Sequence, residues 1–361
     1  MTNQEILSEA LSLLLQLIAI PSVSRDEAAA ADLLEKVISG YGLHPQRKGN
    51  NVWVMSDKWD DTKEIILLNA HIDTVKPVST WTRGPFSPVI EEGRLYGLGS
   101  NDCGGGLVTL LQVFRELTSR PEQRYNFVYL ASCEEEVSGI GGIRSVISDS
   151  PLSSLFSKSS GITAVVGEPT GMQPAIAERG LMVLDGISHG KSGHAARGEG
   201  INAIHEVLDD LLFIRDYHFE KTSPLLGDTK MQCTVINSGT QHNVVPDECR
   251  FVIDVRPNEH YQNEYLFAFL QKHMKKCELT ARSFRLRSSH IDEQHPLIQR
   301  CKALGMQPFG SPTLSDQALM PFPSFKLGPG DSARSHSADE FIGINEIANA
   351  IETYVQLIAN S

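Results

Sequence analysis

Cysteine is sparse in this sequence and is never closely paired. The six cysteines stand at positions 103, 133, 233, 249, 277 and 301, without a Cys-x-x-Cys spacing, which argues against a disulfide framework and a zinc knuckle. Basic residues are also outnumbered, with 32 Lys and Arg against 44 Asp and Glu. Because a phosphate backbone is bound by a basic face, we expect free thiols and no nucleic-acid partner.

Apolar runs long enough to span a bilayer are absent as well. Residues 1–7 also lack the basic segment and apolar stretch of a signal peptide, so we expect no membrane partner and a cytoplasmic location. The chain has 361 residues, of which 41% are hydrophobic and 21% are charged. This composition is typical of a globular protein with room for two domains.

The order of the predicted elements changes once along the chain. In the first part, strand-like runs alternate with helical segments, which is typical of an α/β layered sheet; the strands are expected at 51–55, 65–70, 127–131 and 164–167. From about residue 178 the order is strand, helix, strand, strand, helix, strand, which is the ferredoxin-like arrangement. We expect one domain from residues 1–177 and 291–361, with residues 178–290 inserted as an α+β domain.

Acidic residues and histidines stand where predicted strands or loops end, and this pattern is the strongest functional signal. They are His71, Asp73, Asp102, Glu134, Glu135, Glu168 and His336. Ligands of open α/β sheets bind at the carboxyl ends of the strands, so these side chains would meet in one crevice. Each has an ordinary reading when taken alone, as a hydrogen-bonding histidine, a helix cap or a solvated charge run. Their joint occurrence predicts a two-metal hydrolytic site.

The glycine-rich segment 97–106 could be taken for a dinucleotide-binding turn. The sixth position of its Gly-x-Gly-x-x-Gly pattern is Asp102, and a carboxylate there would repel a pyrophosphate. The segment also does not follow the first strand of a βαβ unit. We therefore expect Asp102 to be a metal ligand or a helix cap rather than part of a nucleotide site.

Several strings together resemble the M20 metallopeptidase family, and within it the deacetylases of acylated amino acids. They are Trp81–Phe86, Gly93–Gly99, Gly167–Thr170, Gly190–Ala195 and Gly328–Gly330. The resemblance covers nearly the whole chain. It implies a zinc-peptidase-like catalytic domain, with a mixed sheet flanked by helices, and an inserted ferredoxin-like domain that serves as a lid and joins two copies in a homodimer.

The resemblance also implies the cofactor and the catalytic residues. It places one Zn²⁺ on His71, Asp102 and Glu168 and a second on Asp102, Glu135 and His336, with Co²⁺ or Mn²⁺ as alternative ions. Asp73 would orient His71, and Glu134 would be the general base. The peptide bond between Asp102 and Cys103 is expected to be cis.

Residues of the inserted domain are implied to complete the site. His194 would reach the active site of the partner subunit and bind the oxyanion there. Asn243 would assist it, and Arg256 would bind the carboxylate of the substrate. Arg179 is a second candidate for that carboxylate, and Gly330 is expected near the substrate. In the family, the aspartate that corresponds to Asp102 is usually followed by a larger residue, then lysine and glycine. This chain has Cys103-Gly104-Gly105 there.

The implied reaction is hydrolysis of the amide bond of a small N-acyl amino acid. N2-acetyl-L-ornithine or an N-acylcitrulline, in arginine biosynthesis, is the expected substrate. Succinyl-diaminopimelate or a dipeptide is the alternative, and residues 313–316 would help to decide the acyl group. The alternative that is not an enzyme is a zinc-binding homologue that has lost activity.

Overall fold

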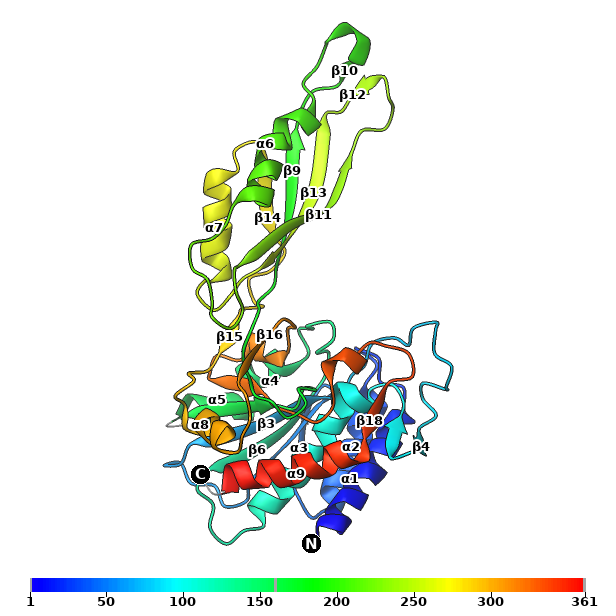
Figure 1. Cartoon of the computed structure of the whole chain (residues 1–361), viewed down its shortest axis with the longest axis vertical. Coiled ribbons are helices and arrows are strands. Elements are labelled where there is room, and N and C mark those ends of the chain that lie inside the picture. Colours follow the sequence, from blue (N-terminus) through cyan, green and yellow to red (C-terminus); the bar gives the residue numbers. More distant parts are fainter. Residues whose placement is uncertain (1, 159–160, 360–361) are drawn as a thin grey trace. The chain divides into compact units, whose positions relative to one another are not determined.

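The computed structural model describes residues 2–158 and 161–359, and the chain divides into two compact units (Figure 1). Unit 1 comprises Met1–Ile176, His290–Phe309 and Ser315–Ser361, and unit 2 comprises Ala177–Ser289 and Gly310–Leu314. Residues 310–314 therefore depart from the expected division, which placed them with residues 291–361. They join unit 2 because Gly310 lies against the backbone of Leu225, whose carbonyl oxygen would be 2.4 Å from a Cβ at position 310.

The main sheet has nine strands and is mixed. Its strands are β1 (Gln46–Lys48), β2 (Asn51–Met55), β3 (Ile65–His71), β6 (Asn126–Ser132), β7 (Ile162–Val166), β8 (Ala175–Glu178), β15 (Ser289–His290), β16 (Phe309–Ser311) and β17 (Ser324–Lys326). They follow the order β1-β2-β6-β3-β7-β17-β8-β15, and β16 pairs with β8. Neighbours from β6 to β17 run parallel, while β1, β2 and β8 pair antiparallel.

Helices cover both faces of this sheet, as the sequence predicts. They are α1 (Asn3–Ile18), α2 (Ala28–Gly40), α3 (Gly105–Thr118), α4 (Ile143–Ser148), α5 (Pro151–Lys158), α8 (Pro296–Ala303) and α9 (Ile344–Ala359). Side chains alternate along a strand, so Ile66 and Leu68 of β3 join the core formed with α1, α2, α3, α8 and α9. Ile65 and Leu67 join the core formed with α4 and α5 on the other face.

Smaller elements surround the main sheet of unit 1. They are the three-stranded sheet β18-β5-β4, made of β4 (Val89–Glu91), β5 (Arg94–Tyr96) and β18 (Phe341–Gly343), and the short turns η1 (Ser100–Gly104), η3 (Asp316–Leu319) and η4 (Ser332–Arg334). Among the residues that the structure describes, no helix combines the length and the apolar character needed to cross a bilayer.

Unit 2 has the ferredoxin-like order of elements. It contains β9 (Met182–His189), α6 (Ala203–Asp216), β11 (Lys230–Ser238), β13 (Glu248–Arg256), α7 (Asn263–His273) and β14 (Glu278–Ala281). The antiparallel sheet has the order β11-β13-β9-β14, and Figure 1 shows α6 and α7 on one side of it. A two-stranded ribbon of β10 (Gly193–His194) and β12 (Val244–Val245), with the turn η2 (Ala195–Arg197), extends from one end of this sheet.

Candidate metal centre

Three parallel neighbours of the main sheet end together and place the first acidic residues. β3 ends at His71, whose register partner on β6 is Ser132, so the acidic run 134–136 follows directly beyond His71. β7 ends at Val166 and leads into Glu168. Because the three strands are parallel, their carboxyl ends form one edge, the usual position of a site in an open sheet.

A close approach between glycines brings Asp102 to the same edge. Gly106, in the first turn of α3, lies so close to Gly167 that a Cβ at position 106 would be 1.8 Å from the Gly167 carbonyl oxygen. Any side chain there would push α3 away from the end of β7. The turn η1, which carries Asp102, precedes α3 directly, and the Asp102–Cys103 peptide bond is cis, as expected.

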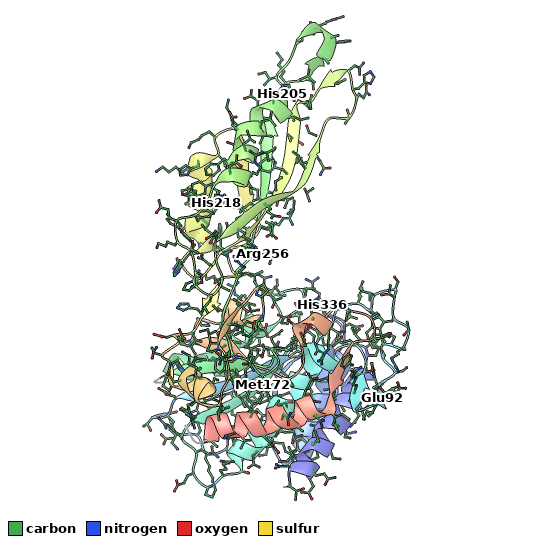
Figure 2. All side chains as sticks on the ribbon, in the orientation of Figure 1. Glu92, Met172, His205, His218, Arg256 and His336 are labelled. Atoms are coloured by element: carbon green, nitrogen blue, oxygen red, sulfur yellow. The ribbon has the colours of Figure 1, made fainter. Side chains whose placement is uncertain are left out.

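The two carboxylate oxygens of Asp102 face two different histidines. Oδ1 lies 3.1 Å from Nε2 of His71, and Oδ2 lies 3.6 Å from Nε2 of His336. Glu168 Oε1 is 3.7 Å from the same His71 nitrogen, and Glu136 Oε2 is 2.9 Å from His336 Nε2. His336 lies in the segment between η4 and β18 (Figure 2). Asp102 thus stands between two donor pairs.

The acidic run contacts the centre through Glu136, whereas Glu135 and Glu134 are the expected ligand and base. Glu136, and not Glu135, pairs with His336, and its side chain is only 8% exposed. Glu136 also forms a group of potential ligand atoms with His71 and Asp102, all within 4.8 Å of one another. Glu134 accepts a hydrogen bond from the N–H of Gly141 at 3.4 Å, so its carboxylate is turned into the turn that follows the run.

Glu135 is the member of the run that is buried among the other charges of the site. Burial raises the pKa of Glu135 well above its usual value, and the negative charges of Glu168 and Asp316 add to the rise while His71 opposes it. A carboxyl group in these surroundings is a candidate proton acceptor. The family resemblance implied this role for Glu134.

Asp73 fixes both His71 and the acidic run. Nδ1 of His71 lies 2.9 Å from the Asp73 carbonyl oxygen and 3.6 Å from its carboxylate. The same carboxylate accepts the N–H groups of Glu135 and Glu136 at 3.0 and 3.1 Å. Burial by itself would raise the pKa of Asp73, but the contacts with His71 and Ser24 and the Glu135 N–H lower it below the usual range. Asp73 is therefore held as a carboxylate.

Glu340 is a site residue that the sequence analysis missed. Its carboxylate accepts hydrogen bonds from the N–H groups of Gly99, Asn101 and Asp102 at 3.0, 2.8 and 2.9 Å. These bonds hold the backbone of η1 in place. Burial raises the pKa of Glu340 to about 7, although these N–H groups oppose the rise. The side chain of Asn101 adds a second link, since it donates to the Asp331 carbonyl oxygen at 3.0 Å.

Asp316 is the second acidic residue that no motif indicated as part of the centre. Its carboxylate accepts a hydrogen bond from Ser132 Oγ at 2.5 Å, and Asn69 donates to the same hydroxyl at 3.0 Å. Burial raises the pKa of Asp316 to about 6, and the Ser132 hydrogen bond opposes the rise. The network lies directly under the ends of β3 and β6.

The donor set fits divalent cations. Imidazole nitrogens and carboxylate oxygens suit Zn²⁺, Mn²⁺ and Co²⁺, and Oε1 of Glu168 is buried without a hydrogen-bond partner, which is costly for a charged group. Burial also raises the pKa of Glu168 to about 7, and the charge of Asp102 adds to the rise. A cation bound beside Glu168 would satisfy the orphaned oxygen and compensate the crowded negative charges.

Gly330 lies against this centre through Asn101. It has a φ of +91°, and a Cβ at this position would be 2.3 Å from Asn101 Oδ1. Only glycine accepts both the left-handed conformation and the close contact. Its expected contact with a substrate stays a prediction.

The remaining predicted site residues belong to unit 2. His194 and Asn243 lie together on the β10–β12 ribbon, where the N–H of Ala195 donates to the Asn243 carbonyl oxygen at 3.1 Å. Both side chains are exposed. Arg256 ends β13 (Figure 2), and its Nε and Nη2 bind the Asp254 carboxylate at 2.8 and 3.0 Å.

Arg179, the second candidate for a substrate carboxylate, is held by backbone instead. Its Nη1 donates to the carbonyl oxygens of Asp228 at 2.6 Å and Arg256 at 3.4 Å, and its Nη2 donates to the Leu226 carbonyl oxygen. Three backbone carbonyl oxygens thus hold this guanidinium, and its contact with a substrate stays a prediction.

Known proteins resemble this chain over most of its length. The chain is 25% identical to an acetylornithine deacetylase of Proteus mirabilis, over 96% of this chain and 95% of that protein. It is 27% identical to a succinyl-diaminopimelate desuccinylase of Verminephrobacter eiseniae, over 75% and 72% of the two chains.

Solved structures share the fold. The aminopeptidase PepT of Bacillus cereus matches with a TM-score of 0.76 at 17% identity and covers 98% of both chains. A dinuclear metal binding peptidase of the M20 family from Bacillus subtilis matches with a TM-score of 0.71 at 16% identity, over 99% and 98% of the two chains. The family model of peptidase family M20/M25/M40 matches residues 67–360, and the chain therefore belongs to this family.

Proposed function

We propose that this chain hydrolyses the amide bond of an N-acyl amino acid, with N2-acetyl-L-ornithine or an N-acylcitrulline as its substrate, at a centre of two divalent cations. The observation that supports this proposal most directly is the position of Asp102, whose two carboxylate oxygens lie 3.1 and 3.6 Å from two different imidazoles. A shared carboxylate of this kind suits two neighbouring cations, as in two-metal hydrolases.

The assignment of ligands follows the observed contacts. We propose that His71, Asp102 and Glu168 hold one cation and that Asp102, Glu136 and His336 hold the other, with Zn²⁺ as the native ion and Co²⁺ or Mn²⁺ as substitutes. When bound, such cations would polarise a substrate carbonyl and lower the pKa of water.

Glu135 is the proposed general base in place of Glu134. Glu135 is buried beside His71, Glu168 and Asp316, and its N–H donates to Asp73. Its carboxylate is therefore held inside the centre, while Glu136 pairs with His336. Glu135 would take a proton from the attacking water and return it to the leaving amine. The contact of the Glu134 carboxylate with Gly141 supports this choice.

Residues of unit 2 are proposed to bind the substrate. His194 with Asn243 would donate hydrogen bonds to the oxyanion, a role that is worth about 3 kcal/mol in other hydrolases. Arg256 would bind the carboxylate of the amino-acid half. Asp254 accepts hydrogen bonds from its Nε and Nη2, which orients the guanidinium.

A panel of substrates tests the proposal. Purified protein with added Zn²⁺ would be assayed on N-acetylornithine, N-acetylcitrulline, their succinyl counterparts, succinyl-diaminopimelate and dipeptides. We expect kcat/KM to be highest on the acetylated pair. A preference for succinyl-diaminopimelate, the substrate in the name of one relative, or for dipeptides would overturn the substrate assignment, and no hydrolysis of any of them would favour an inactive homologue.

The pH dependence of metal binding follows from the state of His336. The hydrogen bond from His336 to Glu136 raises the pKa of His336 to about 9 in the metal-free protein. A cation must displace this proton, so its affinity for the His336 position should rise about tenfold per pH unit from pH 7 and level off above about 9. Calorimetric titration with Mn²⁺ at several pH values measures this slope, and His336→Gln should flatten it.

The same pKa sets a trend in the stability of the metal-free protein. Because the folded-state pKa of His336 lies above the ordinary value of 6.5, its contribution to stability is fully present below about pH 6.5 and is lost as the pH rises through about 9. The imidazole is half exposed, so the contribution is small.

We also propose that unit 2 joins two copies in a homodimer. β11 is an edge strand that pairs only with β13 among the described strands, and its Val235 and Ile236 are exposed. α6 packs against β11 and exposes Leu208 and Leu212. An apolar edge strand beside an apolar helix face is a surface that a second copy can cover by strand pairing.

Charged residues on this edge should separate the two copies. The double variant Val235→Glu with Ile236→Lys is expected to sediment as a monomer, because charges on an edge strand oppose pairing. Sedimentation velocity on the full chain measures the change. The control is Ile90→Lys, an exposed apolar residue of unit 1, which should leave the dimer intact; a wild-type chain that is monomeric at high concentration would contradict the proposal.

A further inference from the structure

Cys103 places a sulfur atom inside the group of ligand atoms around His71. Its Sγ lies within 4.8 Å of a His71 ring nitrogen and of a Glu168 carboxylate oxygen, and the three form a second group of potential metal ligands in unit 1. The thiol is 1% exposed. The mechanism proposed above gives Cys103 no role, although it follows Asp102 directly.

The local backbone explains how a small thiol reaches this place. A Cβ at Gly104 would be 2.4 Å from the Gly99 carbonyl oxygen and 2.6 Å from Leu14 Cδ1, so the next position admits no side chain. The thiol of Cys103 donates to the Gly167 carbonyl oxygen at 3.3 Å. This hydrogen bond holds Sγ beside the residue that precedes Glu168.

A second, independent observation points to a cation at this group. Glu168 Oε1 is buried and accepts no hydrogen bond, so the group contains an unsatisfied anionic oxygen. The centre therefore offers an imidazole, a carboxylate and a thiol whose ligand atoms lie within 4.8 Å of one another.

We propose that Cys103 is an additional, sulfur ligand of the cation that His71 and Glu168 hold, and that it gives this position a preference for thiophilic ions. The inference rests on the proposed metal centre. On binding, the Sγ–H bond breaks, the proton passes to solvent and the sulfur lone pair forms the bond to the cation, without any change of oxidation state. Thiolate ligands favour Zn²⁺ and Cd²⁺ over Mn²⁺.

The absorption spectrum of the Co²⁺ protein tests the proposal directly. A thiolate ligand adds a near-ultraviolet charge-transfer band, while Co²⁺ held by nitrogen and oxygen alone gives only the weak visible bands. We expect the wild-type chain to show both, and Cys103→Ser to lose the charge-transfer band while it keeps the visible bands. The ratio of Cd²⁺ to Mn²⁺ affinity should fall by about tenfold or more in the variant.

Cys133→Ser is the matched control. Cys133 is also buried and also contacts a glycine carbonyl oxygen, that of Gly141 at 3.6 Å, so this variant should keep the charge-transfer band. Thermal unfolding of both metal-free variants checks that they fold. Visible bands without a charge-transfer band in the wild type would overturn the thiol ligand alone, whereas absence of bound Co²⁺ would overturn the metal centre itself.

Discussion

Replacing Glu135 by glutamine is expected to lower kcat by about 10³-fold, within the range of 10² to 10⁴ that general acid–base groups contribute. Glutamine keeps the size of the side chain but cannot accept the proton. Steady-state kinetics on the best substrate of the panel measures kcat, and elemental analysis measures the bound metal. We expect two cations per chain to remain, because Glu135 does not contact His336 or Asp102 as Glu136 does.

Glu134→Gln is the matched control for this prediction. Its carboxylate accepts a hydrogen bond from Gly141 at 3.4 Å and lies against Gly139, so the change should affect the turn rather than the chemistry. We expect kcat within a few-fold of the wild type. Loss of turnover in Glu134→Gln together with full activity in Glu135→Gln would restore the assignment expected from the sequence.

Because three glutamates follow one another, the sequence alone could not assign the proposed ligand and the proposed general base among them. The strand before them and the glycines after them are readable from the pattern, and both are present in the structure as β6 and the bend at 140–142. The contacts that decide which of the three glutamates faces the centre come from residues distant in the sequence. Asp73 accepts the N–H groups of Glu135 and Glu136, and Glu134 has a left-handed φ of 54°, which no rule for successive identical residues predicts.

The sequence was more informative where the signal was periodic. The buried strands β2, β3, β6 and β7 are continuous apolar runs, and the order of elements in unit 2 follows directly from alternating and helical spacing. The single acidic residues Asp102 and Glu168 were also predicted, because each follows a strand or opens a helix. Glu340 and Asp316 were missed because their partners are distant in the chain, and burial is what gives their carboxylates a role.

The second large effect is expected when Asp102 is replaced by asparagine. Its two oxygens face His71 and His336, so the neutral amide would remove one anionic ligand atom from each of the two proposed cations. Changes outside the first coordination sphere already cost 10–100-fold in metal affinity; we therefore expect each cation to bind at least about 100-fold more weakly and turnover to be lost.

The metal content after dialysis separates a shared ligand from one that serves a single cation. Asp102→Asn should retain fewer than one cation per chain, whereas Glu168→Gln and Glu136→Gln should each retain about one, since each belongs to a different donor pair. The N–H of Asp102 still donates to Glu340 in the asparagine variant, so η1 should keep its position, and thermal unfolding of the metal-free protein can verify this. If Asp102→Asn held one cation as tightly as the wild type, Asp102 would serve only the other, and the two imidazoles would mark separate sites rather than one centre.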